Sequence, residues 1–254
     1  MKRSRNLLIS LLIFLILCSG CSNKDELRKQ SSQLYKAIYN NDVRSIQKIL
    51  DQTKLDKLPK QDDLKPEVLA AALDEYEATK LILEAGGSWK SKDLNGNNLL
   101  QIAAVNGNKK LMSYLLIGKK ANINMENELG LTPLHLAIAP SATNDHRKEV
   151  VEWLIKKGAN PLSQSEDGSS AMHIAALQNQ PDVINYLLQF KQMINLTDQK
   201  GRTPLIIAVQ SGNKLSVQEL LNSGSDVNVK DKDGKTAMNY AEGYGLADIQ
   251  LLLK

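Results

Sequence analysis

The 254-residue sequence predicts an all-α protein, a solenoid of about seven helix-turn-helix units joined by hairpin loops. Three observations support this prediction. One alanine recurs at nearly constant spacing, most copies of it follow a glycine-led motif, and a second amphipathic stretch lies between successive motifs. A fixed period of about 20 to 50 residues is typical of architectures in which small identical units stack on their neighbours.

The repeat is defined by a short segment that starts at a glycine. GLTPLHLAIA starts at Gly130, and similar segments start at four other glycines, namely Gly96, Gly168, Gly201 and Gly234. Each segment has one alanine in the same register, and two earlier segments keep this alanine without the glycine. The alanines are Ala37, Ala70, Ala103, Ala137, Ala175, Ala208 and Ala241, separated by 33, 33, 34, 38, 33 and 33 residues.

A period of 33 residues headed by T-P-L-H-x-A resembles the ankyrin repeat. The resemblance covers residues 31–254 and divides them into seven units, at about 31–62, 63–95, 96–129, 130–167, 168–200, 201–233 and 234–254. It implies a solenoid whose concave face, made of hairpin tips and first-helix surfaces, binds a folded protein partner. A specific complex buries about 800 Å² per partner, which three or four adjacent units could supply.

Each part of a unit has a physical reason. Thr132 precedes Pro133, so a hydroxyl can cap the first helix and the proline can occupy its first turn. The recurring alanine is small because the helices of adjoining units must pass close to each other. Stretches such as VVEWLIKKGAN show the apolar spacing of a second helix. We expect Gly118, Gly158 and Gly224 to end these helices in a left-handed turn.

Two segments depart from the regular unit. The 38-residue step places five extra residues in PSATNDHRK, residues 140–148, between the two helices of unit four. A role in binding and a tolerated insertion are both open interpretations. In unit two, residues 57–65 (KLPKQDDLK) replace the usual hairpin, and we expect this charged, proline-containing segment to be irregular.

The first 20 residues have the pattern of a secretory signal peptide. Lys2, Arg3 and Arg5 precede a predominantly apolar segment, residues 7–17. This segment is shorter than the roughly 20 apolar residues that a transmembrane helix needs. We therefore expect residues 1–20 to be removed from the mature protein.

The residues after the apolar segment resemble the lipobox of bacterial lipoproteins. Ser19 and Gly20 are small and precede Cys21, while Cys18 stands where that family usually has an aliphatic residue. The resemblance implies that Cys21 is acylated and anchors the protein to a membrane, and that residues 21–30 form a short charged tether. Ordinary secretion, without a lipid on Cys21, remains the alternative interpretation.

Processing before Cys21 would change the composition of the chain. It removes three of 32 basic residues and none of 28 acidic ones, so the net charge falls from +4 to +1. Neither of the two cysteines remains as a free thiol, which argues against disulfide, thiol-nucleophile and cysteine-metal chemistry. The remaining charges are interspersed, so we expect no nucleic-acid partner.

The three histidines do not form a recognisable catalytic arrangement. His135 and His173 occupy the fourth position of the TPLH motif, where the resemblance implies a hydrogen bond to the backbone of a neighbouring loop. His146 follows Asp145 in the inserted segment, but the sequence has no G-x-S-x-G motif, no paired histidines on a helix face and no phosphate-binding loop. We expect no enzyme activity, cofactor, metal or small-molecule substrate.

Candidate partner-binding residues are contact-prone side chains outside the core pattern. Trp89 stands where the family has a valine, so it either packs in a hairpin or anchors a partner, whereas Trp153 replaces a core leucine and is expected to be structural. The other candidates belong to the first helices, the turns after them and the insertion; they are Tyr39, Tyr76, Asn106, Asn144, His146, Gln178, Gln210 and Tyr244.

A lipid-anchored ankyrin array outside the inner membrane resembles the immunity lipoproteins that bacteria pair with lipase toxins of the type VI secretion system. The resemblance implies an inhibitor that binds a toxin lipase in the periplasm. Ser22 favours the outer membrane, because an aspartate there would retain the protein in the inner membrane, and we expect the array to face the periplasm. The alternatives are an accessory scaffold for a periplasmic enzyme such as a catalase and a surface-exposed interaction module.

Overall fold

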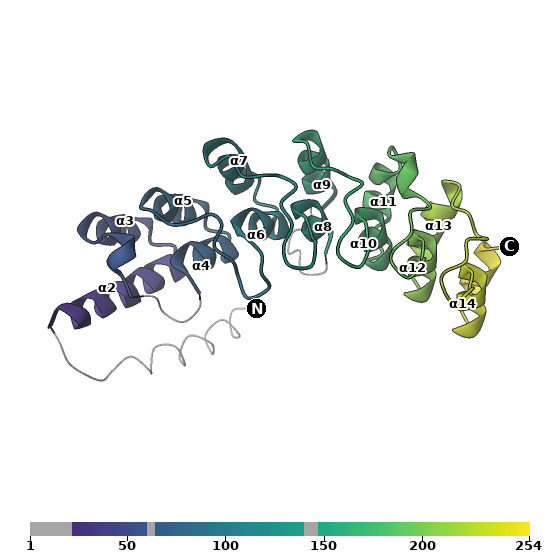
Figure 1. Ribbon diagram of the computed structural model, residues 1–254, viewed down its shortest axis with the longest axis horizontal. Helices are drawn as coiled ribbons and strands as arrows, with labels where there is room; N and C mark the ends of the chain where they lie inside the picture. Colours follow the sequence, from purple (N-terminus) through teal and green to yellow (C-terminus); the bar gives the residue numbers. More distant parts are fainter. Residues whose placement is uncertain (1–21, 60–63, 140–146) are drawn as a thin grey trace.

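The computed structural model describes residues 22–59, 64–139 and 147–254 (Figure 1). The predicted all-α solenoid is confirmed, because the described chain forms paired helices and contains no β-strand, only an isolated bridge between Gln164 and Ser170. The pairs are α2 (Ser22–Tyr39) and α3 (Val43–Gln52), α4 (Pro66–Ala72) and α5 (Tyr76–Glu84), α6 (Leu99–Asn106) and α7 (Lys109–Gly118), α8 (Pro133–Ile138) and α9 (Arg147–Lys156), α10 (Ala171–Leu177) and α11 (Pro181–Leu187), α12 (Pro204–Gln210) and α13 (Lys214–Asn222), and α14 (Ala237–Gly243) and α15 (Ala247–Leu252). Two short 3-10 helices follow α3 and α11, η1 (Leu55–Lys57) and η2 (Lys191–Met193).

The helices stack in two rows. Each first helix contacts the first helix of the next unit, from α2 through to α14, and these helices lie along the lower side in Figure 1. The second helices lie along the upper side, where α3, α5 and α7 are in contact in sequence, as are α9, α11, α13 and α15. Between units three and four, the extensive helix contact is that of α6 with α8.

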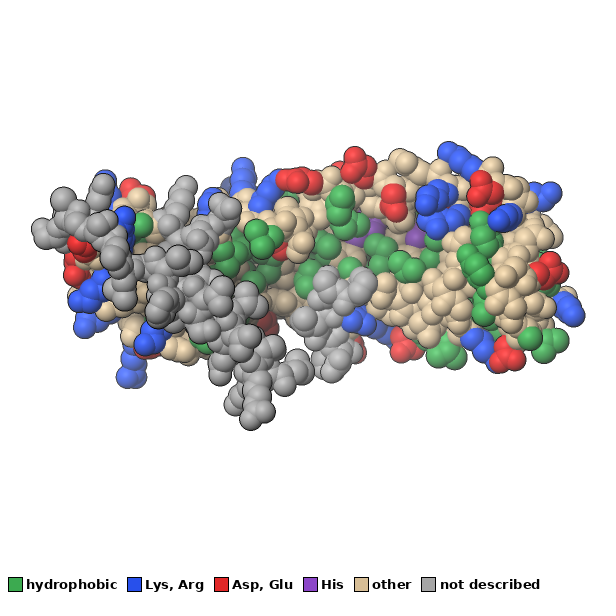
Figure 2. All heavy atoms as spheres, turned by 90° about the horizontal axis from the view of Figure 1, so that it is seen from below, with side chains coloured by type: hydrophobic (Ala, Val, Ile, Leu, Met, Phe, Trp, Pro, Cys, Tyr) green, Lys and Arg blue, Asp and Glu red, His purple; other side chains and the backbone are tan. Residues whose placement is uncertain are grey.

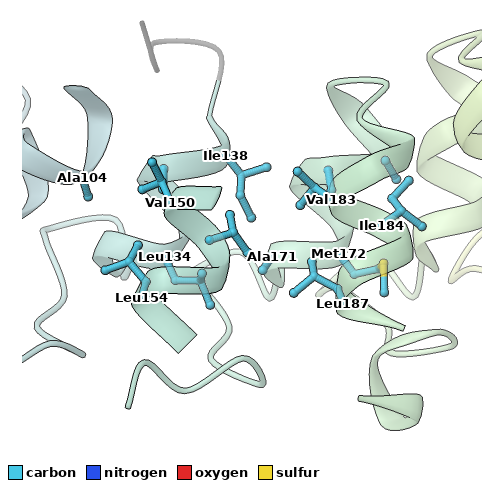
Figure 3. Packing of buried hydrophobic residues seen from close by; sticks show 14 of the residues in the cluster. Ala104, Leu134, Ile138, Val150, Leu154, Ala171, Met172, Val183, Ile184 and Leu187 are labelled. Carbon is cyan, nitrogen blue, oxygen red and sulfur yellow. The ribbon is translucent and has the colours of Figure 1, made fainter. Parts of the chain in front are cut away.

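The core runs the length of the array. The recurring alanines are buried, as expected for closely packed neighbouring units. Figure 3 shows how two units share this core, with Leu134, Val150 and Leu154 packed in unit four and Ile138 and Ala171 lying between the two helix pairs. Among the residues that the structure describes, the buried hydrophobic side chains fall within residues 34–253.

Two local features differ from the sequence-based expectations. The segment expected as a tether is helical from Ser22 onward and continues into α2, because it is rich in helix-forming residues and has Asp25 in its first turn. Gly158 and Gly224 adopt the expected left-handed conformation, with φ of +97° and +87°, but the expectation for Gly118 was wrong. Lys120 takes that conformation instead, with φ of +53°. The 34-residue step through this unit allows one more residue before the turn.

Candidate protein-binding surface

The hairpin turns between units are held by a side-chain oxygen that accepts two backbone N–H groups. Asp93 Oδ1 accepts from Asn95 (2.9 Å) and Asn97 (2.8 Å). Asn127, Asp198 and Asp231 accept the same pair of bonds in three later hairpins. Such turns fix the backbone of the tip without using the tip side chains, which remain available for contacts with a partner.

Neighbouring hairpins are also bonded to each other through the backbone. The Glu166 N–H donates to the Leu129 carbonyl, the Gln199 N–H to the Asp167 carbonyl, and the Lys232 N–H to the Lys200 carbonyl, each at 2.9 Å. These bonds join the hairpins that precede units four to seven into one continuous edge. The tips are therefore fixed relative to one another before any partner binds.

Each of the two motif histidines links the start of its own helix to the loop before the next unit, an arrangement that we call the brace. The His135 Nδ1 accepts from the Thr132 N–H at 3.2 Å, and its Nε2 lies 3.1 Å from the Ser163 carbonyl. His173 makes the equivalent contacts with the Ser170 N–H (3.2 Å) and the Arg202 carbonyl (2.9 Å). The expected structural role of both imidazoles is confirmed. Burial lowers the pKa of His135 to about 4 and also lowers the pKa of His173, so both rings are neutral at pH 7.

Unit three makes the same brace with a residue that does not titrate. The Gln101 Oε1 accepts from the Asn98 N–H at 2.9 Å, and its Nε2 donates to the carbonyls of Met125 (3.1 Å) and Leu131 (2.9 Å). An amide and a neutral imidazole each offer one acceptor and at least one donor, so either fits this position.

Exposed hydrophobic side chains occur at the hairpin tips and at the ends of first helices. Leu94 and Leu129 belong to two hairpin tips, and Leu94 is 87% exposed. Leu177 ends α10, and Tyr244, which is 58% exposed, follows α14. Figure 2, which views the first-helix side, shows hydrophobic side chains distributed along this face. We call the hairpin tips and first-helix ends together the inner surface.

The charge of the inner surface changes along the array. Glu166 and Asp167 are exposed at the hairpin of unit five. The exposed charges at the hairpins of units six and seven include three lysines, Lys200, Lys232 and Lys235, and one acidic residue, Asp233. Figure 2 shows acidic side chains near the middle of the upper edge of this face and basic ones toward the C-terminal end. A partner that covers these units must match both signs of charge in this order.

A hydrogen-bonded cluster fixes the basic end of the inner surface. The Tyr240 hydroxyl donates to Asp231 Oδ2 at 2.5 Å, and the Lys235 Nζ lies 5.4 Å from the centre of the Tyr240 ring. Nearby, the Arg202 guanidinium pairs with Asp198 at 2.6 Å and donates to the Gln210 Oε1 at 3.2 Å. These bonds orient the aromatic and cationic groups that a partner would meet.

The Tyr240 phenol is expected to ionise at an unusually high pH. The hydrogen bond to Asp231 raises its pKa to about 12, whereas an ordinary tyrosine titrates near 10. Ultraviolet absorbance should therefore show a phenol that ionises about two pH units above the ordinary value, and Tyr240→Phe should remove that step. If the substitution removed a phenol with a pKa near 10, the bond to Asp231 would not persist in solution.

The residues proposed from the sequence are dispersed along the array. Tyr39 is half-buried at the end of α2, and the Asn106 side chain donates to the Ala71 carbonyl at 2.9 Å, which links units two and three. Gln178 is half-buried after α10, and Gln210 is held by Arg202. Of these candidates, Tyr244 is the most open to a partner.

Of the other candidates, Tyr76 and Trp89 lie within the described residues. Tyr76 is the first residue of second helix α5, not part of a first helix or the turn after it, and its ring packs edge-on against Tyr114. Trp89 is half-buried against the core, which agrees with hairpin packing. Cys21, Asn144 and His146 lie outside the described residues.

Sequence reasoning missed the leucines of the inner surface. Leu129 directly precedes Gly130, and Leu94 lies two positions before Gly96. Solvent-exposed turns ordinarily have polar residues at such places. Leu177 lies two residues after the recurring Ala175, next to the selected Gln178. An apolar residue at a tip position was the available signal.

The described residues offer no alternative site of the metal-dependent or membrane-crossing kind. Among residues 22–59, 64–139 and 147–254, no three histidine, cysteine or acidic side chains come together in a way that could hold a metal ion. Within the same ranges, no helix has both the length and the apolar character needed to cross a membrane.

Comparison with known proteins identifies the repeat. The family described as "Ankyrin repeats (3 copies)" matches residues 68–165, 140–231 and 193–254. The chain is 31% identical over 159 residues to the nuclear factor NF-kappa-B p105 subunit of Gallus gallus, covering 59% of this chain and 16% of that protein. It is 27% identical over 209 residues to the human transient receptor potential cation channel subfamily A member 1, covering 78% of this chain and 18% of the channel.

A third relative, the mouse B-cell lymphoma 3 protein homolog, is 29% identical over 171 residues, which cover 63% of this chain and 37% of that protein. The chain thus spans well under half the length of these relatives, whose shared part is the repeat array. Ankyrin repeats are protein-binding modules. The matched residues include the helix pairs from α6 and α7 through to α14 and α15. The chain belongs to the ankyrin-repeat family.

Proposed function

We propose that this protein is a lipid-anchored immunity protein that binds and neutralises a secreted antibacterial lipase in the periplasm, without catalysis of its own. The observation that carries the proposal is the inner surface, where exposed leucines and a tyrosine lie beside charges of both signs. Protein interfaces combine apolar and aromatic anchors with a polar rim in this way. Hairpins that are already bonded to each other lose little conformational entropy on binding.

The expected lipid on Cys21 gives the proposal its location. The acyl chains would be attached one residue before α2, so the array would begin at the membrane without a long linker. Ser22 supports the outer membrane, with the array in the periplasm. An inhibitor held there would meet a lipase at the bilayer that the lipase attacks.

The proposal is tested with residues 22–254 as bait for proteins of the source bacterium grown with its secretion system active. We expect a lipase to be retained and its activity to fall as the array is added. Cells that lack the protein should also be killed by toxin-bearing siblings. Capture of a resident enzyme with its activity intact, and no sensitivity in the deletion strain, would instead support the accessory scaffold.

Charge insertion at the hairpin tips should weaken partner binding. We expect Leu94→Lys and Leu129→Lys each to raise the Kd about 30-fold, the effect of removing an interface hot spot of about 2 kcal/mol. Leu215→Lys and Leu251→Lys are matched controls, because these leucines are similarly exposed but lie on second helices α13 and α15. Calorimetric titration with the captured lipase measures all four. Weaker binding by the controls alone would move the site to the second-helix side.

A further inference from the structure

The second helices of units three and four carry a basic surface that the inner surface does not include. Residues 109–120 contain four lysines and no acidic residue, and residues 147–157 contain four basic and two acidic residues. The helices involved, α7 and α9, lie on the upper side in Figure 1, opposite the first helices. We define the outer basic patch as the exposed lysines of these two segments, Lys110, Lys120, Lys148, Lys156 and Lys157.

The loops that follow α7 and α9 are joined by hydrogen bonds. The Asn124 side chain accepts from the Asn160 N–H at 2.8 Å and donates to the Gly158 carbonyl at 3.4 Å. Asn124 follows Lys120 by four residues, and Gly158 directly follows Lys157. The lysines that end the two segments therefore lie on the same edge of the array.

Helix stability does not account for the basic residues that begin α7. Lys109 and Lys110 occupy its first turn, where a positive charge opposes the helix dipole. Four other second helices carry an acidic residue in that turn, namely Glu77 in α5, Glu149 in α9, Asp182 in α11 and Asp248 in α15. An anionic partner would offset the unfavourable placement in α7.

The two segments that carry the patch also contain the side chains that proteins use at a lipid interface. Ile117, at the end of α7, is 77% exposed. The Lys119 Nζ lies 5.7 Å from the centre of the half-buried Tyr114 ring, and the Lys157 Nζ lies 5.8 Å from that of Trp153. An exposed aliphatic residue, amphipathic rings and long lysines together match the polarity gradient between headgroups and acyl chains.

We propose that the outer basic patch docks on a membrane surface rich in anionic phospholipid. Docking by this side turns the first helices and hairpin tips away from the bilayer. The array then lies on the membrane with its inner surface open to a partner, rather than standing out from its N-terminus. This proposal does not depend on what the partner is.

The test uses residues 22–254, which hold every buried hydrophobic residue of the described ranges and lack the apolar N-terminal segment. We expect this protein to sediment with vesicles of phosphatidylglycerol and phosphatidylethanolamine, and less as salt is added. It should not sediment with vesicles of phosphatidylcholine alone. Equal binding to both vesicle types, or to neither at low salt, would overturn the proposal.

Two charge-reversal variants with the same net charge separate the patch from general attraction. In the first variant, glutamate replaces four lysines of the patch, Lys110, Lys120, Lys156 and Lys157. In the second variant, glutamate replaces four exposed lysines of the hairpin edge, Lys200, Lys230, Lys232 and Lys235.

The patch variant should lose vesicle partitioning by about a hundredfold or more, while the hairpin variant should keep it. Circular dichroism establishes that both are folded. An equal loss in the two variants would show attraction by net charge alone and overturn the proposal. Binding of the patch to polyglutamate with no binding to vesicles would also overturn it, and would point to an acidic protein instead.

Discussion

Gly168→Ala is expected to lower the free energy of unfolding by about 3 kcal/mol, because two costs fall on the same methyl group. Gly168 has φ of +80°, a conformation that costs an alanine about 1–2 kcal/mol. A Cβ at this position would also lie 2.6 Å from the Gln199 backbone nitrogen in the next hairpin. The hairpins must separate to admit it, which breaks the bond from Gln199 to the Asp167 carbonyl and costs about 1 kcal/mol more.

Gly234→Ala is the matched control for this effect. Gly234 occupies the same place in the last hairpin, with φ of +73°, but no atom lies within 4 Å of a Cβ built on it. Its substitution should cost only the conformational part, about 1–2 kcal/mol. Urea unfolding measures both variants, and equal losses would mean that the hairpins are not packed against each other as described.

Acidification is expected to destabilise the array between pH 6.5 and 4, by about 3 kcal/mol for His135 alone. An unfolded histidine has a pKa near 6.5, and burial lowers the folded value for His135 to about 4. Between these values the unfolded chain binds more protons, so stability rises with pH. The contribution is therefore complete above the unfolded pKa and is lost as pH falls through the folded one. His173, whose pKa is also lowered, acts in the same direction.

The control for the pH effect comes from unit three. His135→Gln and His173→Gln reproduce the brace that Gln101 already makes, with donor and acceptor kept and the titration removed. The double variant should unfold at nearly the same urea concentration at pH 7 and at pH 5, whereas the parent protein should not. If the parent and the variant lost the same stability on acidification, carboxylates rather than these imidazoles would be responsible.

The sequence was sufficient for the features that repeat. The alanine at a period of 33 predicted close helix packing, and this alanine is buried in every unit. The Thr-Pro start predicted a cap, and the Thr203 hydroxyl accepts from the Ile206 N–H at 3.3 Å. These signals are strong because several units carry the same residue for the same reason.

The sequence was insufficient where one unit departs from the others. Gly118 looked like a helix-ending glycine, yet the extra residue in that loop moves the left-handed position to Lys120. Polar composition suggested a tether before residue 31, but the same residues are good helix formers and extend α2. Binding candidates were selected for residue type, so Asn106, which is used between units, was included and Leu94 was not.

The bonds between units have a consequence for how the chain would respond to force. The hairpin before unit seven is held to the hairpin before unit six by the bond between the Lys232 N–H and the Lys200 carbonyl. Unit seven itself is held to unit six by the ion pair between Lys214 and Asp248 and by helix packing. All of these are contacts with the adjacent unit. Tension between an anchored N-terminus and a bound C-terminal end would therefore detach one unit at a time from the end. Each detachment lengthens the chain by roughly 110 Å, so the array would yield in steps while its remaining units stay folded.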